Sequence, residues 1–170
     1  MSLNQTELKT ILDYDPETGA FTWKHRANGP KWWNTRWAGK AAGSTYRIGN
    51  TFYTCIRISG QKFYAHRLAW FYVYGEWPQH EIDHRDRDGT NNRLSNMRPA
   101  TRTLNKGNQR RRKDNTHGFK GARRCRSNWQ ASISKDGVRF HLGTFSSPEL
   151  AHEAYVEAAK KLYGEFARRA

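Results

Sequence analysis

The spacing of apolar and polar positions divides the chain into segments with different periods. Between residues 44 and 64 apolar and polar side chains alternate, which is typical of strands with one buried face, and Gly60 marks a hairpin turn. Residues 65–74 carry bulky apolar side chains and end before Gly75, so the pattern predicts a core helix there. His66, near the start of this segment, stands either beside a site or in the core, and the second interpretation is favoured.

The first 43 residues show weaker patterns. Residues 3–13 predict a short helix and residues 20–24 a strand, with a turn at residues 15–19 between them. Residues 25–43 show no clear period and predict a loop. The amino-terminal half is therefore expected to be rich in β-structure, with one main helix.

After residue 117 the pattern becomes regular again. Alternation predicts three strands, at residues 119–125, 128–135 and 138–144. Ser147 and Pro148 then form a helix start, and the helix is expected to reach Tyr163, since Gly164 follows. This part predicts a small three-stranded antiparallel sheet packed on one helix, which makes the whole chain α+β.

A strongly basic stretch lies between these halves. From Arg98 to Arg126 there are eleven Lys or Arg residues and one acidic residue. Like charges repel one another and pack poorly, so we expect a linker at residues 110–117, dividing the chain into domains at 1–109 and 118–170.

Composition adds a class of partner. The chain has 170 residues, 30 Lys plus Arg against 15 Asp plus Glu, a net charge of +15 and a pI near 10.2. Such an excess favours a polyanion, because cations bound to phosphates release counterions. No apolar run approaches the length of a membrane span, and no signal-like segment opens the chain, so a soluble cytoplasmic protein is expected. Cys55 and Cys125 form no Cys-x-x-Cys pair, which argues against structural zinc.

Three tryptophans in the predicted loop allow two interpretations. They are Trp32, Trp33 and Trp37, and they stand among Lys and Arg residues. They form either a cationic aromatic surface against nucleic acid or a cover over a sheet that lacks aliphatic side chains. The second interpretation is favoured.

The stretch from Ile82 to Asn108 is poor in apolar residues but rich in groups that bind metals and move protons. Its chemically useful residues are Asp83, His84, Asn96 and Asn105, with a turn at Asp88-Gly89 and a helix capped by Thr101. Imidazole titrates near neutrality, so His84 is the natural general base. Asp83 and the amide oxygen of Asn105 are hard donors that favour Mg²⁺, with Mn²⁺ as the alternative, over Zn²⁺.

This spacing resembles the HNH (ββα-metal) nuclease motif in its phage-type His-Asn-Asn variant. The resemblance implies that Asp83 and Asn105 bind the metal, that His84 activates water and that Asn96 orients His84. Neighbouring side chains on a regular strand point to opposite faces. Asp83 and His84 can therefore flank one phosphate only if the strand ends or distorts there.

The carboxy-terminal part resembles an APETALA2-type DNA-binding domain over residues 117–168. The resemblance rests on GFKGARR, HLGTF, AHEAY and AAKKLYGEFA. It implies that an exposed sheet face enters the major groove, with DNA-facing side chains at Arg123, Gln130, Ser132, Arg139 and His141 and with Arg124 and Arg126 nearby. Ser and Gln on this face argue against strong base selectivity, because Arg paired with guanine is the commonest specific contact.

Together these patterns predict a metal-dependent endonuclease that acts on double-stranded DNA, and the resemblance implies one of the phage or prophage homing type. The remaining DNA contacts are expected from Arg98 and Arg102 on the cleaved strand and from Arg110, Arg111 and Arg112 in the linker. A non-catalytic DNA-binding regulator and an RNA-binding protein are the rival functions. Nicking or double-strand cleavage, and a monomer or a DNA-assembled dimer, remain open.

Overall fold

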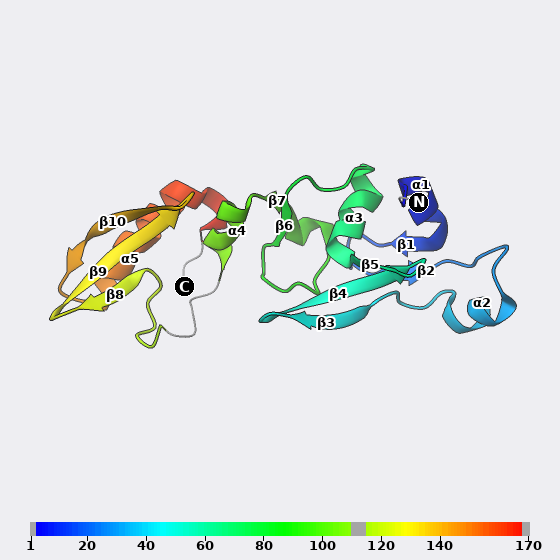
Figure 1. Cartoon of the computed structure of the whole chain (residues 1–170), viewed down its shortest axis with the longest axis horizontal. Coiled ribbons are helices and arrows are strands. Elements are labelled where there is room, and N and C mark those ends of the chain that lie inside the picture. The colour runs from blue at the N-terminus through cyan, green and yellow to red at the C-terminus, as the bar shows by residue number, and fades with distance from the viewer. Residues whose placement is uncertain (1–2, 110–114, 168–170) are drawn as a thin grey trace. The chain divides into compact units, whose positions relative to one another are not determined.

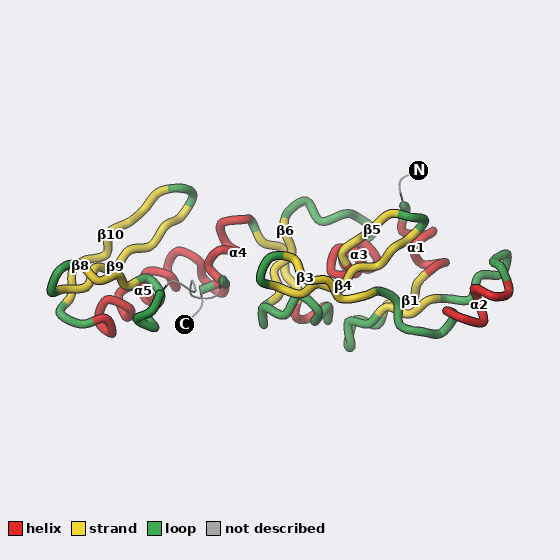
Figure 2. The backbone as a smooth tube through the Cα atoms, turned by 60° about the horizontal axis from the view of Figure 1, so that its bottom comes forward, coloured by secondary structure: helices red, strands yellow, loops and turns green. Residues whose placement is uncertain are grey.

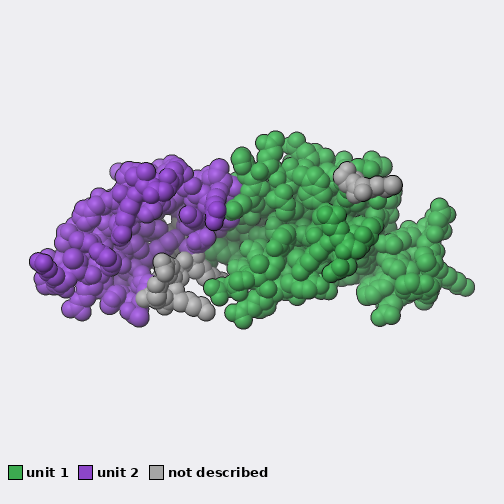
Figure 3. All heavy atoms as spheres, in the orientation of Figure 1, with its two compact units in different colours: residues 1–99 green, residues 100–170 purple. Residues whose placement is uncertain are grey.

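The computed structural model describes residues 3–109 and 115–167, and its fold is α+β (Figure 1). The chain forms two compact units, residues 1–99 and 100–170, called unit 1 and unit 2 below (Figure 3). Most of the predicted linker at 110–117 falls outside the described residues. The predicted division into a nuclease domain and a recognition domain stays a prediction, and the compact units divide at Pro99 instead of near residue 109.

Unit 1 contains three small antiparallel sheets and three helices among its described residues (Figure 2). In chain order its elements are α1 (Gln5–Ile11), β1 (Leu12–Tyr14), β2 (Phe21–Trp23), α2 (Lys31–Trp37), β3 (Ser44–Ile48), β4 (Thr51–Ile58), β5 (Gln61–Tyr64), α3 (Ala65–Tyr74), β6 (Glu81–His84), a 3₁₀ turn (Leu94–Asn96) and β7 (Met97–Ala100). The sheets pair β1 with β2, β3 with β4 and β5, and β6 with β7.

The core of unit 1 lies where α3 meets α1 and the β3–β4–β5 sheet. Leu8, Leu12, Ile56 and Leu68 are fully buried there. The helix predicted at 65–74 is confirmed, and it ends because Gly75 takes a left-handed backbone with φ 79°. The predicted helix at 3–13 is shorter, since the chain turns into β1 at Leu12.

The prediction of a loop throughout residues 25–43 is wrong, because α2 lies within it. Asn34 holds this short helix by accepting from the backbone N–H of Arg26 at 2.9 Å and donating to its carbonyl at 2.8 Å. Trp33 packs edge-on against Trp23, with ring centroids 5.6 Å apart. No residue of α2 is buried, so the helix has no apolar period for the sequence to reveal.

Unit 2 is a three-stranded sheet covered on one face by a helix (Figure 1). Its elements are α4 (Arg102–Asn108), β8 (Ala122–Cys125), β9 (Asn128–Lys135), β10 (Val138–Phe145), α5 (Pro148–Tyr163) and a 3₁₀ turn (Gly164–Phe166), with strand order β10-β9-β8. Ser147 caps α5 by accepting from Leu150 N–H, as its sequence predicts. The predicted sheet and helix are confirmed.

Helix α4 packs against the other elements of unit 2. Leu104 contacts the cluster formed by Tyr155, Tyr163 and Phe166. A side chain at Gly107 would meet the ring of Tyr163 at 2.9 Å, so glycine permits this close approach.

Candidate active site

Strand β6 ends where the predicted chemistry begins. Its last three residues, Ile82, Asp83 and His84, are all buried, and the chain turns directly after His84, where Arg87 has φ 67°. Asp83 and His84 can flank one phosphate only if the strand ends or distorts at this place. The strand does end there.

The loop after His84 is held by side chains that bond to its own backbone. The Asp86 carboxylate accepts from the N–H of Asp88 at 2.9 Å and from Nδ2 of Asn91 at 2.6 Å. Burial alone raises the pKa of Asp86, but the hydrogen bonds from Asp88, Asn91 and Asn96 outweigh it and lower the pKa below its usual value. An ionised Asp86 therefore ties the two ends of this loop together.

Asn96 braces the same loop. Its Oδ1 accepts from the N–H of Asp86 at 3.1 Å, and its Nδ2 donates to Oδ1 of Asp86 at 3.0 Å and to the carbonyl of Asn91 at 2.8 Å. Its carbonyl also accepts from the N–H of Arg85 at 2.9 Å. Asn96 was predicted to orient His84. Its hydrogen bonds hold the loop that follows His84, so they support this role only indirectly.

The direct amide contact of His84 is Asn92. Its Oδ1 lies 3.3 Å from Nε2 of His84, and its Nδ2 donates to the carbonyl of Thr90 at 3.2 Å. Because the amide N–H is directed at Thr90, the oxygen faces the imidazole and accepts the proton of Nε2. In the neutral ring the basic nitrogen is then Nδ1.

The β1–β2 hairpin contacts the backbone of Asn92 and of its neighbours. Tyr14 donates its hydroxyl proton to the carbonyl of Asn92 at 2.7 Å, and the N–H of Leu94 donates to the carbonyl of Pro16 at 3.0 Å. Gly19 lies so close that a side chain there would meet Asn92 backbone at 2.4 Å. Asn92 is itself only 2% exposed, so its amide has a fixed place.

Two aromatic rings, those of His66 and Tyr53, lie near the imidazole of His84. His66 contacts it edge-on with centroids 5.2 Å apart, and Tyr53 lies 6.2 Å away. Burial, followed by the nearby His84 and Arg67, lowers the pKa of His66 to about 3. His66 is therefore neutral at pH 7 and adds no charge beside His84. Its Nδ1 is buried and has no hydrogen-bond partner among the residues that the structure describes.

Asp83 forms an ion pair within the unit. Arg98 donates to its Oδ2 from Nε at 2.9 Å and from Nη2 at 2.8 Å, and both side chains are buried. Arg98 was predicted to hold the cleaved strand, but its guanidinium is occupied with Asp83 and only 6% of the residue is exposed. This arrangement fixes the carboxylate instead of presenting an arginine to solvent.

The two side chains predicted to bind a metal have, each by itself, the chemistry of ligands for a hard divalent cation. Asp83 offers a carboxylate in a fixed orientation, and Asn105 an amide oxygen, which are ligands that Mg²⁺ accepts. Among the described residues no three His, Cys, Asp or Glu side chains gather as a metal site. Asn105 lies in the first turn of α4 with Thr101 as the cap, as predicted, and α4 belongs to unit 2. The pairing of Asn105 with Asp83 stays a prediction, as does a DNA contact by the exposed Arg102.

In unit 2 the predicted DNA-facing side chains share one sheet face. Strand register places Arg123 opposite Gln130, His141 opposite Ser132, and Arg139 opposite Ser134. Helix α5 covers the other face, over Ala131 and Ile133.

Hydrogen bonds order two of the arginines on this open face. Arg139 donates to Oγ of Ser132 at 2.8 Å, and Arg123 donates to Oε1 of Gln130 at 3.3 Å. Arg124 pairs with Trp129 on the covered face, and Arg126 sits in a tight turn with φ 56°. Arg110, Arg111 and Arg112 lie outside the described residues.

Sequence reasoning missed the contacts of three residues of the site. Asn92 and Tyr14 were not singled out, and Arg98 was assigned to DNA and not to Asp83. Each contact joins residues far apart in the chain, such as Tyr14 with Asn92 and Asp83 with Arg98. Local periodicity carries no signal of such pairs.

Comparison with known proteins finds similarity to HNH endonucleases over the segment that contains the site. Residues 63–106 match the family model described as HNH endonuclease. The chain is 34% identical over 87 residues to an uncharacterized HNH endonuclease of Acanthamoeba polyphaga mimivirus, covering 51% of this chain but only 44% of that protein. It is 29% identical over 120 residues to Protein 3.8 of Escherichia phage T7, covering 66% of this chain and 98% of that protein.

No solved structure matches the chain significantly. Within residues 3–109 and 115–167, no helix has the length and apolar character that a membrane span needs. The segment with the buried Asp83 and His84 lies inside the region matched by the family model. Residues 63–106 are therefore similar to the HNH endonuclease family, whose members are nucleases.

Proposed function

We propose that this chain is a metal-dependent DNA endonuclease of the phage homing type, with His84 as its general base. The observation that carries the proposal is the buried contact between His84 and Asn92, next to the fixed carboxylate of Asp83. A buried imidazole with one nitrogen assigned to an amide oxygen is prepared to take a proton on the other.

In the proposed reaction Nδ1 of His84 accepts a proton from a water molecule, whose oxygen forms a bond to the phosphorus. The bond from phosphorus to the 3′ oxygen breaks, and that oxygen takes up a proton, which leaves 5′-phosphate and 3′-hydroxyl ends. Asp83 and Asn105 would hold Mg²⁺ or Mn²⁺, which when bound supplies positive charge against the charge that develops on phosphate and leaving oxygen. Asn92 keeps the imidazole oriented, and Asn96 keeps its loop closed.

Unit 2 is proposed to recognise duplex DNA as an APETALA2-type domain. Its open sheet face carries Arg123 and Arg139 beside uncharged Gln and Ser side chains, which provides phosphate contacts and few base-specific pairs. The net charge of +15 supports a polyanionic partner. We place the reaction in the cytoplasm of a bacterial cell that carries a phage or prophage.

The test is incubation of supercoiled plasmid, containing candidate target DNA, with wild type and with His84→Ala, in Mg²⁺ and in EDTA. The proposal requires open-circular or linear product only with wild type and metal, and the form of the product distinguishes nicking from double-strand cleavage. A His84→Ala variant that cuts as fast as wild type would contradict the assignment of the base. Plasmid that is bound but never cut under any metal, on any target, would favour a DNA-binding regulator.

A further inference from the structure

Helix α2 and the segments beside it form an end of unit 1 that the proposed reaction leaves unexplained. The helix lies at the end of unit 1 opposite to β6 and its catalytic residues (Figures 1 and 2). In the space-filling view the same end stands out as a lobe (Figure 3). A lobe far from His84 takes no direct part in breaking the phosphodiester bond.

The structure separates the three tryptophans that the sequence left together. Trp33 is half-buried, packed on Trp23 and beneath the guanidinium of Arg26, whose Cζ lies 3.7 Å from the ring centre. Trp32 is 65% exposed and Trp37 38% exposed. The favoured interpretation, a cover over a sheet, therefore describes Trp33 but not Trp32.

Trp32 is not needed to hold α2 in place. The helix is anchored through Asn34, which bonds both backbone groups of Arg26, and through Trp33. At helical spacing Trp32 and Arg36 share the opposite side, with Lys31 and Thr35 next to them. Exposing an indole gains nothing from the hydrophobic effect, so its position favours contact with a partner.

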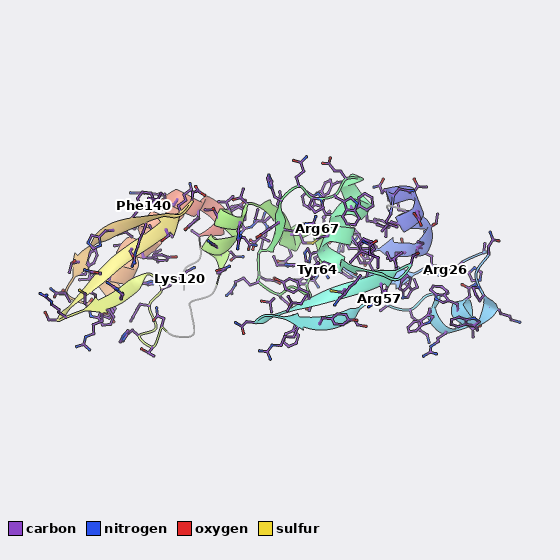
Figure 4. All side chains as sticks on the ribbon, viewed as in Figure 1. Arg26, Arg57, Tyr64, Arg67, Lys120 and Phe140 are labelled. Atoms are coloured by element: carbon purple, nitrogen blue, oxygen red, sulfur yellow. The ribbon has the colours of Figure 1, made fainter. Side chains whose placement is uncertain are left out.

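The charged residues of the lobe indicate which kind of partner it could bind. From His25 to Lys40 the chain contains four Lys or Arg residues and no Asp or Glu. Three of these cations, Lys31, Arg36 and Lys40, are exposed. The fourth, Arg26, lies against the rings of Trp23 and Trp33, and Figure 4 labels its side chain. Exposed indoles between cations, without acids, complement sugar and phosphate along a nucleic-acid backbone.

We propose that the outer face of α2, formed by Lys31, Trp32 and Arg36, binds the backbone of duplex DNA away from the cleaved phosphate. This inference rests on the proposed function, since it assigns an additional contact to the same substrate. The lobe lengthens the DNA segment that unit 1 holds, and Trp32 lies against sugars while Lys31 and Arg36 pair with phosphates.

The experiment measures binding of full-length protein to a fluorescent linear duplex in EDTA, so that no cleavage is required. Trp32→Ala combined with Arg36→Ala should weaken binding by about ten-fold and reduce the slope of log affinity against log salt by about one. Tyr74→Ala, an aromatic residue 51% exposed on α3, is the matched control and should change affinity less than two-fold.

A double variant that binds duplex DNA within two-fold of wild type, with an unchanged salt slope, would overturn the proposal. The proposal would also be overturned if the double variant lost affinity for duplex RNA but kept its affinity for duplex DNA. Melting temperatures equal to wild type show that the variants are folded, which the exposure of Trp32 predicts. Because binding is measured without metal, failure here leaves the cleavage assay of the proposed function unaffected, and failure of cleavage leaves this assay interpretable.

Discussion

The two units bury different kinds of side chain. Of the six buried polar or charged residues that the structure describes, five lie in unit 1, namely His66, Asp83, His84, Asn92 and Arg98, and one, Asn108, lies in unit 2. The interior of unit 2 is built instead from alanines and aromatic rings, such as Ala131, Ala151 and Tyr155. Its charged residues lie on the surface, among them Arg123 and Arg139 on the open face of the sheet.

This difference agrees with the functions proposed for the two units. Burying polar groups costs free energy unless they are paired, so a fold retains a cluster of them where chemistry needs a fixed environment. A domain that recognises DNA through a sheet face needs only a rigid support beneath it, which small residues on α5 provide by allowing close packing. Substitutions in the buried polar cluster of unit 1 should therefore act on stability and catalysis, and substitutions on the open sheet face of unit 2 should act on affinity.

The largest effect on stability is expected from Arg98→Ala. The substitution leaves the buried carboxylate of Asp83 without its partner, and breaking such a pair costs about 3–5 kcal/mol. Arg93→Ala, an exposed arginine in the same stretch, is the control and should change the free energy of unfolding by less than about 0.5 kcal/mol. Equal denaturant midpoints for the two variants would show that the ion pair does not support unit 1.

A pair of glycines tests the packing of unit 2. Gly121 and Gly137 have nearly equal backbone angles, φ 83° and 82°, but a side chain at Gly121 would lie 2.0 Å from the ring of Tyr155, while one at Gly137 would meet nothing within 4 Å. Gly137→Ala should cost about 1 kcal/mol from backbone strain, and Gly121→Ala about 2–4 kcal/mol from strain and overpacking. Calorimetry that found the same cost for both would contradict the close packing of α5 on β8.

The buried His66 predicts a pH dependence confined to unit 1. Because its pKa is lowered to about 3 in the folded chain, the unfolded chain binds more protons between that value and 6.5. Its stabilising contribution is complete above pH 6.5 and is lost as the pH falls below it.

Between pH 7 and pH 5 His66 should account for a loss of about 2 kcal/mol, and His66→Phe should remove this part of the dependence. The measurement is thermal unfolding of wild type and variant across this range. Parallel curves for the two proteins would mean that His66 is protonated equally in both states.

The smallest effect is expected on the open sheet face of unit 2. Arg139→Ala should weaken duplex binding by about five-fold and leave the unfolding free energy within about 0.5 kcal/mol, because the residue is exposed and pairs with Ser132 at the surface. Lys160→Ala, on the outer side of α5, serves as control for general charge. If Lys160→Ala weakens binding as much as Arg139→Ala, binding through the sheet face is refuted.

Sequence patterns sufficed for elements whose burial follows one period. The bounds of α3 and α5 were predicted almost to the residue, because apolar faces and terminal glycines define them. Sequence patterns failed for α2, because this helix buries no residue and so has no apolar face.

For the site, the motif predicted the place of Asp83 and His84 but not their direct partners. Arg98 and Asn92 reach them through tertiary contacts, and the attachment of Asn92 to Tyr14 spans most of unit 1 in sequence. The same limit applies to α4, whose packing in unit 2 depends on Gly107 meeting Tyr163. Such pairs are determined by how the chain closes on itself, which local composition does not encode.

The most direct test of the account is the single-turnover cleavage rate of Asn92→Ala on saturating DNA that wild type cuts. If the buried cluster of unit 1 carries the chemistry, this rate falls by about 100-fold while DNA affinity stays within two-fold, because the imidazole of His84 loses its orientation but the binding surfaces are intact. Ser95→Ala, at an exposed position of the same segment, should cut like wild type. An Asn92→Ala rate equal to that of wild type would contradict the assignment of His84, held by Asn92, as the base.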